Sequence, residues 1–420
     1  MNYDQMPNRD IFCIDMKSFY ASCIAMAEGL DVMREPIAVV GSLTQPGAVV
    51  LAASPMMKSR FNIKTGNRRF EIPKHPDIRL FEPRMQFFLE TSVAITRLLL
   101  QYVPREAVHV YSVDESFVDL SGTERLWGPP EETAKAIQRA IFDQFRIPSA
   151  VGMGPNMLMA KLALDLDAKR AGFAKWAFED IPRKLWPIRP LSEMWGIGRQ
   201  TEASLNNMGI YSVGDLARAD LKELEKRFGI MGNQLYHHAW GVDLSTFGEP
   251  NIDVAKTKSF GQGQMLMRDY PTRKEISIVL LEMCEDVMMR MRQAGFVGRT
   301  ISLGVSYSRR AQEKGFYRST TLKEPTCETM TMYQTCVDLL DEHFAGEPAR
   351  QLAVRISNLE KVQGIQLDLF DERKAQRQVL AHTIDEIRAR FGPSSILRAA
   401  SYTPSGTAIE RNSKIGGHLA

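Results

Sequence analysis

The feature that most constrains this sequence is a set of acidic residues at the ends of predicted strands. The segment Ile11–Asp15 has the pattern of a short buried strand that ends on a carboxylate. Two further strand-like segments between residues 108 and 120 are so close that they must form a hairpin, with Asp114 and Glu115 at its tip. If these strands are neighbours in one sheet, three carboxylates converge on one edge. Such a cluster implies divalent cations, and oxygen-only ligation favours Mg²⁺ or Mn²⁺ over zinc.

The alternative interpretation is that an Asp-Glu pair at a hairpin tip is ordinary turn chemistry, and the pair taken alone does not decide. The surrounding pattern predicts a β-α-β-β-α-β order around one mixed sheet. Helices are expected at residues 18–28, 85–102, 131–145 and 157–169, and strands at residues 11–15, 37–40, 49–53, 108–111, 117–120 and 150–153. Residues 62–83 are rich in Pro, Lys and Arg and show little periodicity.

Composition excludes several classes of protein. The chain has 420 residues, of which 44% are hydrophobic and 25% charged, so wholesale disorder is excluded and two to four domains are expected. The formal net charge of +3 neither indicates nor excludes a nucleic-acid partner. No apolar stretch approaches the roughly 18 residues of a membrane span, and the polar N-terminus lacks a signal-peptide pattern. Five cysteines without a CxxC spacing predict reduced thiols in a cytoplasmic protein, with no zinc site.

The pattern changes after Arg170. Residues 171–190 carry one glycine and three prolines, which indicates a domain boundary. Residues 191–245 look all-helical, and residues 256–360 return to strands and helices, with 300–307 as the clearest strand. A final helix is expected at about 374–391. This helix would either pack on the body of the protein or bind a partner. Its apolar face consists of Leu380, Ile384, Ile387 and Phe391.

Three motifs in order resemble those of the Y-family (UmuC/DinB-type) translesion DNA polymerases. They are Asp15–Ser22, Tyr111–Asp119 and Gly152–Ala163, which match the family's D-x-x-x-F-[YF]-A, S-[IV]-D-E-x-[FY]-x-D and G-[IV]-x-x-[NT]-x-x-x-A-K-[LIM]-A patterns. The resemblance covers about residues 10–370 and is most similar to the ImpB/MucB/SamB, UvrX-like Gram-positive branch. It implies an α+β multidomain fold of the right-hand type.

The resemblance also implies a domain plan. A ferredoxin-like palm would comprise residues 1–22 and 80–170, and small fingers residues 23–79. A helical thumb with a helix-hairpin-helix would comprise residues 171–245, and an α/β little finger residues 256–360. A C-terminal tail with a clamp-binding peptide would comprise residues 361–420. These parts together account for the chain, and we expect no segment large enough for a proofreading exonuclease. Low-fidelity, template-directed synthesis from dNTPs on primer-template DNA is therefore expected.

By the same resemblance, the catalytic carboxylates are Asp15, Asp114 and Glu115. They would hold two Mg²⁺ ions, or Mn²⁺, together with the Met16 carbonyl, for attack of a primer 3′-hydroxyl on a dNTP. Lys17 departs from relatives that carry a second acidic residue there, so it is not counted among the ligands.

Nucleotide-binding residues follow from the same motifs. Phe19 and Tyr20 occupy the aromatic positions after Asp15, and Tyr20 is expected to act as a steric gate against a 2′-hydroxyl; the alternative is a core aromatic. Lys161 is expected to neutralise the triphosphate. Residues 54–60 match the family poorly, so Lys58 is the preferred second cation and Arg60 the alternative.

DNA contacts are expected in two places. The Met194–Arg199 segment has the helix-hairpin-helix form, in which Gly196, Gly198 and Arg199 face a DNA phosphate. Residues 297–322 carry five basic residues against one acid, and a merely solvated basic loop is the alternative. The basic residues assigned to DNA there are Arg299, Arg309, Arg310 and Arg318.

A pentapeptide near the C-terminus resembles the bacterial sliding-clamp-binding motif. It consists of Gln366, Leu367, Asp368, Leu369 and Phe370. Its apolar side chains suit a groove on the clamp, whereas the alternative is a chance strand edge. The enzyme would be a monomer when it is not on the clamp. A non-catalytic protein that binds DNA or the clamp, and a nucleotidyl cyclase-like enzyme with a related palm, are the competing functions.

Overall fold

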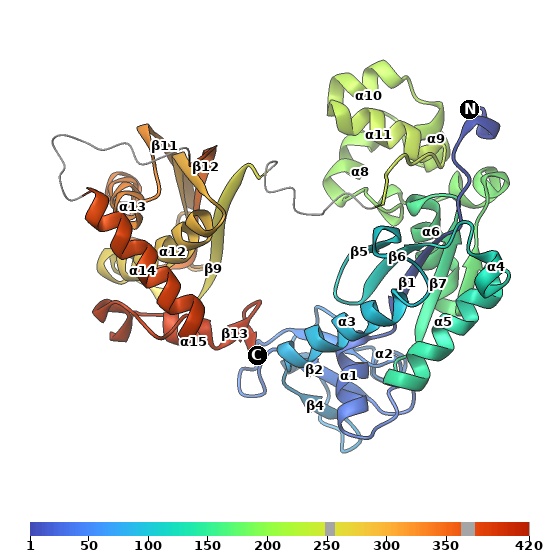
Figure 1. Ribbon diagram of the computed structural model, residues 1–420, viewed down its shortest axis with the longest axis horizontal. Coiled ribbons are helices and arrows are strands. Elements are labelled where there is room, and N and C mark those ends of the chain that lie inside the picture. Colours follow the sequence, from blue (N-terminus) through green and yellow to red (C-terminus); the bar gives the residue numbers. More distant parts are fainter. Residues whose placement is uncertain (248–256, 363–373, 420) are drawn as a thin grey trace. The chain divides into compact units, whose positions relative to one another are not determined.

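The computed structural model describes residues 1–247, 257–362 and 374–419. The chain divides into two compact units (Figure 1). The first unit is Met1–Glu249 with His418–Ala420, and the second unit is Pro250–Gly417. Across the described residues, no helix combines the length and the apolar composition needed to cross a bilayer.

A five-stranded sheet forms the centre of the first unit, in the order β5-β6-β1-β7-β8. Its strands are β1 (Ile11–Met16), β5 (Val108–Val110), β6 (Glu115–Asp119), β7 (Ser149–Gly154) and β8 (Phe173–Lys175). Strands β5, β6, β1 and β7 are antiparallel neighbours, and β8 is parallel to β7. With α3 (Met85–Leu99) after β1 and α5 (Pro130–Phe145) after β6, this is the ferredoxin-like order expected of a palm.

Close packing joins β7 to the helix that follows it. Helix α6 (Met157–Ala163) continues into a π-helical turn, η4 (Leu164–Ala168), and a last turn, α7 (Lys169–Ala171). A Cβ atom added at Gly152 would lie 2.2 Å from the Leu164 nitrogen, and one at Gly154 would lie 2.5 Å from the Ala160 nitrogen. Only glycine permits this approach, which brings the helix against the sheet face that carries Cys13 and Phe117.

A second, three-stranded sheet lies between β1 and α3 in the sequence, with the order β3-β2-β4. It is built from β2 (Ile37–Val40), β3 (Val50–Ala53) and β4 (Arg79–Phe81), beside α1 (Phe19–Ala27) and α2 (Pro55–Phe61). Strand β4 was not expected, because three partly exposed residues give no periodic signal. It pairs with β2, so this sheet includes two residues that the sequence assigned to the palm.

Residues 191–245 are helical, as expected. The helices of this segment are α8 (Arg199–Asn206), α9 (Val213–Arg218), α10 (Leu221–Phe228) and α11 (Ile230–Ala239); α4 (Glu124–Trp127) is a separate short helix before α5 in the palm. The four helices α8 to α11 pack together. Their apolar residues form one buried cluster with α6, which includes Leu158, Leu205 and Leu224.

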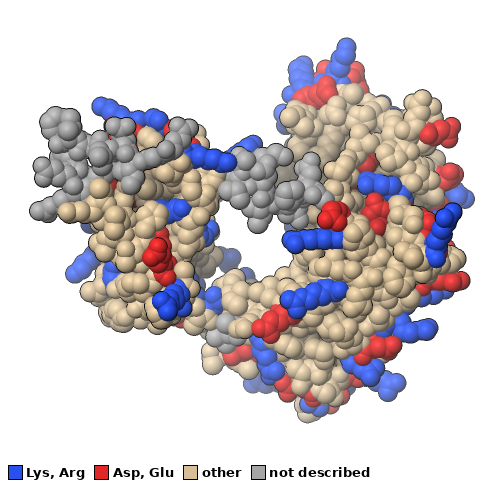
Figure 2. Space-filling model, in the orientation of Figure 1, with Lys and Arg blue, Asp and Glu red and all other residues tan. Residues whose placement is uncertain are grey.

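Figure 2 shows basic and acidic side chains interspersed over the visible surface, in agreement with the small net charge.

The second unit is a four-stranded antiparallel sheet, in the order β11-β10-β12-β9, packed against two helices. Its elements are β9 (Ser259–Tyr270), α12 (Arg273–Gln293), β10 (Phe296–Tyr307), β11 (Gly315–Thr326), α13 (Thr329–His343) and β12 (Ala349–Lys361). Alternate residues of β10, such as Ile301 and Leu303, are fully buried in a cluster with Met283 and Leu340 from the helices. The predicted strand at 300–307 is confirmed and extends further.

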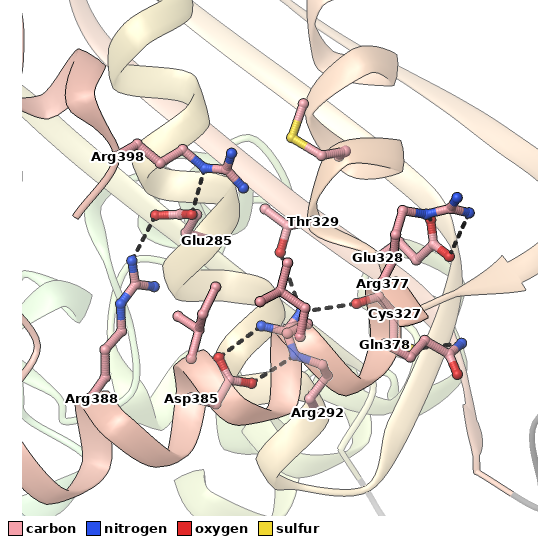
Figure 3. A pocket seen from close by; sticks show the side chains of 14 residues that line it. Glu285, Arg292, Cys327, Glu328, Thr329, Arg377, Gln378, Asp385, Arg388 and Arg398 are labelled. Atoms are coloured by element: carbon pink, nitrogen blue, oxygen red, sulfur yellow. Dashed lines mark hydrogen bonds and ion pairs between the residues drawn. The ribbon is translucent and has the colours of Figure 1, made fainter. Parts of the chain in front are cut away.

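Most of the C-terminal segment belongs to this unit. It contains α14 (Lys374–Phe391), α15 (Ala408–Asn412) and β13 (Lys414–Ile415), whereas β14 (His418–Leu419) is assigned to the first unit. None of the four residues of the predicted apolar face of α14 is fully buried: Ile384 and Ile387 are partly buried, Leu380 is 60% exposed and Phe391 is 66% exposed. Instead, Asp385 accepts two hydrogen bonds from Arg292 of α12, at 2.7 and 2.9 Å (Figure 3). Of the two alternatives left open for this helix, the structure shows packing on the body, through ion pairs with α12.

A second ion-pair group strengthens this attachment. Glu285 of α12 accepts hydrogen bonds from Arg388 at 3.0 Å and from Arg398 at 2.7 Å (Figure 3). Next to these pairs lies a cavity of about 230 Å³ between α14, α12 and the start of α13. Arg388 and Glu285 are largely buried, so the pairing is shielded from water.

Replacing Asp385 with alanine tests this attachment. The change leaves the buried Arg292 guanidinium without its carboxylate, so the free energy of unfolding of the second unit should fall by about 3–5 kcal/mol. Chemical denaturation of the full chain measures the change. The matched control is Glu386→Ala, an exposed carboxylate on the same helix, with an expected effect within about 0.5 kcal/mol. Equal effects of the two substitutions would contradict the assigned role of Asp385.

Candidate active site

Strand pairing brings the predicted carboxylates to one edge of the palm sheet. Asp15 lies directly opposite Glu115 in the antiparallel register of β1 and β6. Asp114 precedes Glu115, and its carbonyl accepts a hydrogen bond from the Met16 amide at 2.8 Å. The Ser112 hydroxyl donates to the Asp114 carboxylate at 2.6 Å. The convergence that the sequence predicted is therefore present in the backbone.

A pocket of about 510 Å³ opens beside this edge. It is lined by Asp15, Met16, Lys17, Ser18, Phe19, Tyr20, Leu51, Ala52, Lys58, Thr65, Val113, Asp114, Ala150 and Lys169. Two of the three predicted carboxylates, both predicted aromatics and one of the two candidate cations of residues 54–60 thus share one cavity. Glu115, Lys161 and Arg60 are not among the lining residues.

The pocket places two carboxylates, Asp15 and Asp114, among three lysines, Lys17, Lys58 and Lys169. The pKa of Asp15 is raised to about 6, chiefly by burial; the charge of Lys169 lowers it, and the charges of Asp114 and Glu115 raise it. The ammonium group of Lys169 lies 3.5 Å from Asp15. A divalent cation would relieve this repulsion, so the oxygen donors and their electrostatics fit Mg²⁺ or Mn²⁺.

Glu115 is turned toward other partners. Its Oε2 atom accepts a hydrogen bond from Lys161 at 2.8 Å, and its Oε1 atom accepts one from the Cys13 thiol at 3.0 Å. Burial opposes the charge of Lys161, but the bond to Glu115 raises the lysine pKa above its ordinary value. Within the described residues, no three acidic, His or Cys side chains are already gathered to hold one metal ion. Metal binding by all three carboxylates therefore requires Glu115 to leave these partners.

The predicted cations divide into those that reach the pocket and those that do not. Lys58 lines the pocket and donates to the Ser18 hydroxyl at 3.1 Å, and burial lowers its pKa. Arg60 instead pairs with Asp77 at 2.7 Å. Lys169, which the sequence did not indicate as a site residue, follows the π-helical turn and lies beside Asp15. The sequence predicts a continuous helix that ends at this lysine, eight positions after Lys161. A continuous helix does not indicate the direction that a π-helical turn gives to the lysine.

Tyr20 is fixed in the pocket by an aromatic stack. Its ring lies 4.5 Å from that of Phe88, with an interplanar angle of 14°. The chain reaches it through Ser18, which adopts the left-handed conformation with φ of 51°. This strained residue turns the chain sharply from β1 into α1, so that Phe19 and Tyr20 follow Asp15 into the same cavity. Tyr20 thus lines the same pocket as Asp15 and Asp114.

The predicted helix-hairpin-helix turn lies at the start of α8. Gly196 has φ of 93°, which glycine adopts without strain, and Gly198 is the residue before the first turn of α8. Gly196, Gly198 and Arg199 are exposed, whereas Ile197 between the glycines is buried. The turn therefore presents backbone N–H groups to solvent, as a phosphate contact requires.

The predicted basic residues of the second unit differ in their intramolecular partners. Arg299 pairs with Glu360 at 2.9 Å, and Arg318 donates to the Tyr317 carbonyl. The exposed residues Arg309 and Arg310 lie in the loop between β10 and β11. The sequence analysis missed a shallow groove across the sheet. It is lined by Ser259, Gly261, Gln262, Gly263, Tyr317, Ala353, Val354 and Arg355.

The predicted clamp-binding pentapeptide, Gln366–Phe370, lies outside the described residues. Its flanks are described, because β12 ends at Lys361 and α14 begins at Lys374. The sequence of the pentapeptide is therefore the support for this site.

Comparison with known proteins identifies the family. The model of the impB/mucB/samB family matches residues 14–165, and the model of the C-terminal domain of the same family matches residues 257–369. A thumb-domain model described for DNA polymerase-iota matches residues 192–243. Together these ranges contain the palm carboxylates, the helical segment and the second sheet.

Full-length relatives agree with these matches. UvrX of Bacillus subtilis (strain 168), whose name refers to UV-damage repair, is 48% identical over 420 residues, covering 100% of this chain and 99% of that protein. DNA polymerase IV 2 of the same strain is 38% identical, covering 98% of this chain and 99% of that protein. A solved Y-family DNA polymerase chimera of Dbh and Dpo4 covers 84% of this chain and 100% of its own, with a TM-score of 0.65 and 18% identity.

The fold and the relatives define the class: this is a DNA-directed DNA polymerase of the right-hand, Y-family type. The chain belongs to the impB/mucB/samB family within that class. The resemblance noted in the sequence motifs is thus confirmed.

Asp15 gives a test of the pocket's electrostatics. In the metal-free protein its carboxyl group should titrate near pH 6, well above the ordinary value of 3.8. Since this folded-state pKa is raised, the associated stability is present below pH 3.8 and is lost as the pH rises through about 6. Lys169→Met should raise the midpoint further. Carbon-detected NMR, assigned with Asp15→Asn, measures the midpoint, and a value near 4 would contradict the burial argument.

Proposed function

We propose that this enzyme carries out template-directed, low-fidelity DNA synthesis in translesion repair, by two-metal transfer of a dNMP to a primer 3′-hydroxyl. The observation that carries the proposal is the shared pocket of Asp15, Asp114, Tyr20, Lys58 and Lys169. It combines carboxylates for metal ions, an aromatic ring for a sugar and cations for a triphosphate. The names of relatives, DNA polymerase IV 2 and the UV-damage protein UvrX, support the same role.

Each group in the pocket has a defined task in this proposal. Asp15, Asp114, Glu115 and the Met16 carbonyl would hold the two metal ions. Bound there, Mg²⁺ supplies Lewis-acid activation of the attacking hydroxyl and stabilisation of the leaving phosphate oxygen. Lys58 and Lys169 orient the triphosphate and balance the charge that develops on it. Lys161 acts one step away, because it contacts Glu115 rather than the pocket.

Tyr20 supports selection of deoxyribonucleotides. Its ring is held by Phe88, so it cannot turn aside at low cost when a sugar with a 2′-hydroxyl approaches. Phe19, buried beside it, fixes the start of α1. A steric gate needs a rigid ring, and the stacking geometry supports that requirement.

The remaining parts support grip on the substrate. The turn at Gly196 and Gly198 with Arg199 suits duplex phosphates, and so do the exposed Arg309 and Arg310. We extend the proposal to sliding-clamp binding by Gln366–Phe370, on the strength of the five-letter sequence match.

Loss of Asp114 tests the catalytic assignment. Primer extension with Mg²⁺ by Asp114→Ala should fall about a thousandfold or more, because several kcal/mol of transition-state stabilisation depend on the metal ions. Chelation of divalent cations should abolish extension by the parent. Asp77→Ala, a carboxylate paired with Arg60 outside the pocket, is the matched control and should retain extension. Extension that survives Asp114→Ala would remove the two-metal assignment and favour a different catalytic centre.

Substitution of Tyr20 tests sugar selection. Tyr20→Ala should raise the efficiency of ribonucleotide relative to deoxyribonucleotide incorporation by about a hundredfold, since the steric clash with the 2′-hydroxyl disappears. Single-nucleotide kinetics with both sugars measure the ratio. Tyr20→Phe keeps the ring and should retain parent selectivity. Unchanged selectivity in Tyr20→Ala would show that Tyr20 is only a packing residue.

A further inference from the structure

The carboxylate of Glu115 is held on both of its oxygens by buried groups outside the nucleotide pocket. Lys161 donates to Oε2 at 2.8 Å and the Cys13 thiol donates to Oε1 at 3.0 Å. Cys13 is 0%, Lys161 6% and Glu115 7% exposed, so water does not compete with these bonds. In such surroundings each hydrogen bond is costly to break without a replacement.

Strand register explains why a thiol faces this carboxylate. Cys13 and Asp15 are two residues apart on β1, so their side chains share one face of the sheet. Asp15 pairs with Glu115 and Cys13 pairs with Phe117, which makes Cys13 a diagonal neighbour of Glu115. Helix α6 covers this face and supplies Lys161. Position 13 lies in an apolar strand, yet its side chain carries a hydrogen-bond donor.

The other two carboxylates behave differently, because Asp15 and Asp114 line the pocket and Glu115 does not. We infer that Cys13 is a positioning residue for Glu115. With Lys161 it holds the Glu115 carboxylate turned away from the pocket, which is called the closed position below, and these two donors compete with the divalent cations for that carboxylate. This inference rests on the proposed two-metal function, which requires Glu115 at the pocket. It assigns to Cys13 a role in setting metal affinity, beyond packing.

The two partners of Glu115 differ in what they lose when the carboxylate leaves. Lys161 keeps Asp165, which lies 3.2 Å from its ammonium group. Asp165 in turn lies 2.8 Å from Lys169, so the lysine stays within a charged network. For Cys13, Glu115 is the hydrogen-bond acceptor that faces its thiol. Removal of the thiol leaves Oε1 buried without that donor and destabilises the closed position.

Metal binding by the full-length protein, without DNA or dNTP, tests the inference. Free Mn²⁺ is measured by electron paramagnetic resonance during titration of the parent, Cys13→Ala and Cys13→Val. Both substitutions should lower the Mn²⁺ dissociation constant by about threefold to tenfold. Cys13→Ser keeps a donor and should restore the parent value. Cys23→Ala removes another fully buried thiol, on α1, and should also leave the parent value.

A double substitution separates positioning from a general structural effect. In a Glu115→Gln background, Cys13→Ala should no longer change the dissociation constant. Unchanged or weaker Mn²⁺ binding in Cys13→Ala and Cys13→Val, with thermal unfolding like that of the parent, would overturn the inference. An equal shift in the Glu115→Gln background would overturn it as well. Because no turnover is measured, a protein that shows the shift but fails in primer extension would refute the polymerase proposal alone.

Discussion

The antiparallel pairing of β1 between β6 and β7 is the constraint on which the active site depends. This pairing sets Asp15 opposite Glu115 and places Asp114 at the same edge. A shift of one residue in the β1–β6 register would send every side chain of β1 to the other face, and Asp15 and Cys13 would then point away from α6. Both faces of β1 are buried, since Ile11 and Ile14, which point to opposite faces, are both 0% exposed.

A chain of alternating charges connects the carboxylates of this edge through the helix that covers it. Glu115 contacts Lys161, Lys161 contacts Asp165, Asp165 contacts Lys169, and Lys169 lies 3.5 Å from Asp15. Three of these residues lie on α6 and the turns that follow it, where the π-helical turn η4 changes the direction of the last lysine. The glycines of β7 permit this helix to lie close enough for the chain to form. The charges beside the carboxylates therefore depend on the close backbone packing of α6 against β7.

Two kinds of interaction hold the second unit together: an apolar core between its sheet and helices, and ion pairs that attach α14. Its sheet and helices share an apolar core, which determines the fold through alternation along β10 and β12. The C-terminal helix α14 is attached by the Arg292–Asp385 pair and by the arginines around Glu285. Ion pairs of this kind are specific in geometry but contribute little net stability compared with an apolar contact. Of the predicted apolar face of α14, Leu380 and Phe391 are exposed and Ile384 and Ile387 are partly buried, so periodicity alone did not decide how this helix is attached.

The sequence by itself determined four of the five strands of the palm sheet, the three carboxylates and the aromatic pair at Phe19 and Tyr20, because hydrophobic periodicity and short motifs are local properties. It did not indicate β8, which lies in the range expected for the thumb. It did not determine which side chains meet, since that depends on contacts between residues far apart in the chain. Tertiary structure decided that Lys58 rather than Arg60 reaches the pocket, that Lys169 joins it, and that Glu115 turns to Cys13 and Lys161. The physical reason is that burial and register select partners for charged groups, and neither is written in the local pattern.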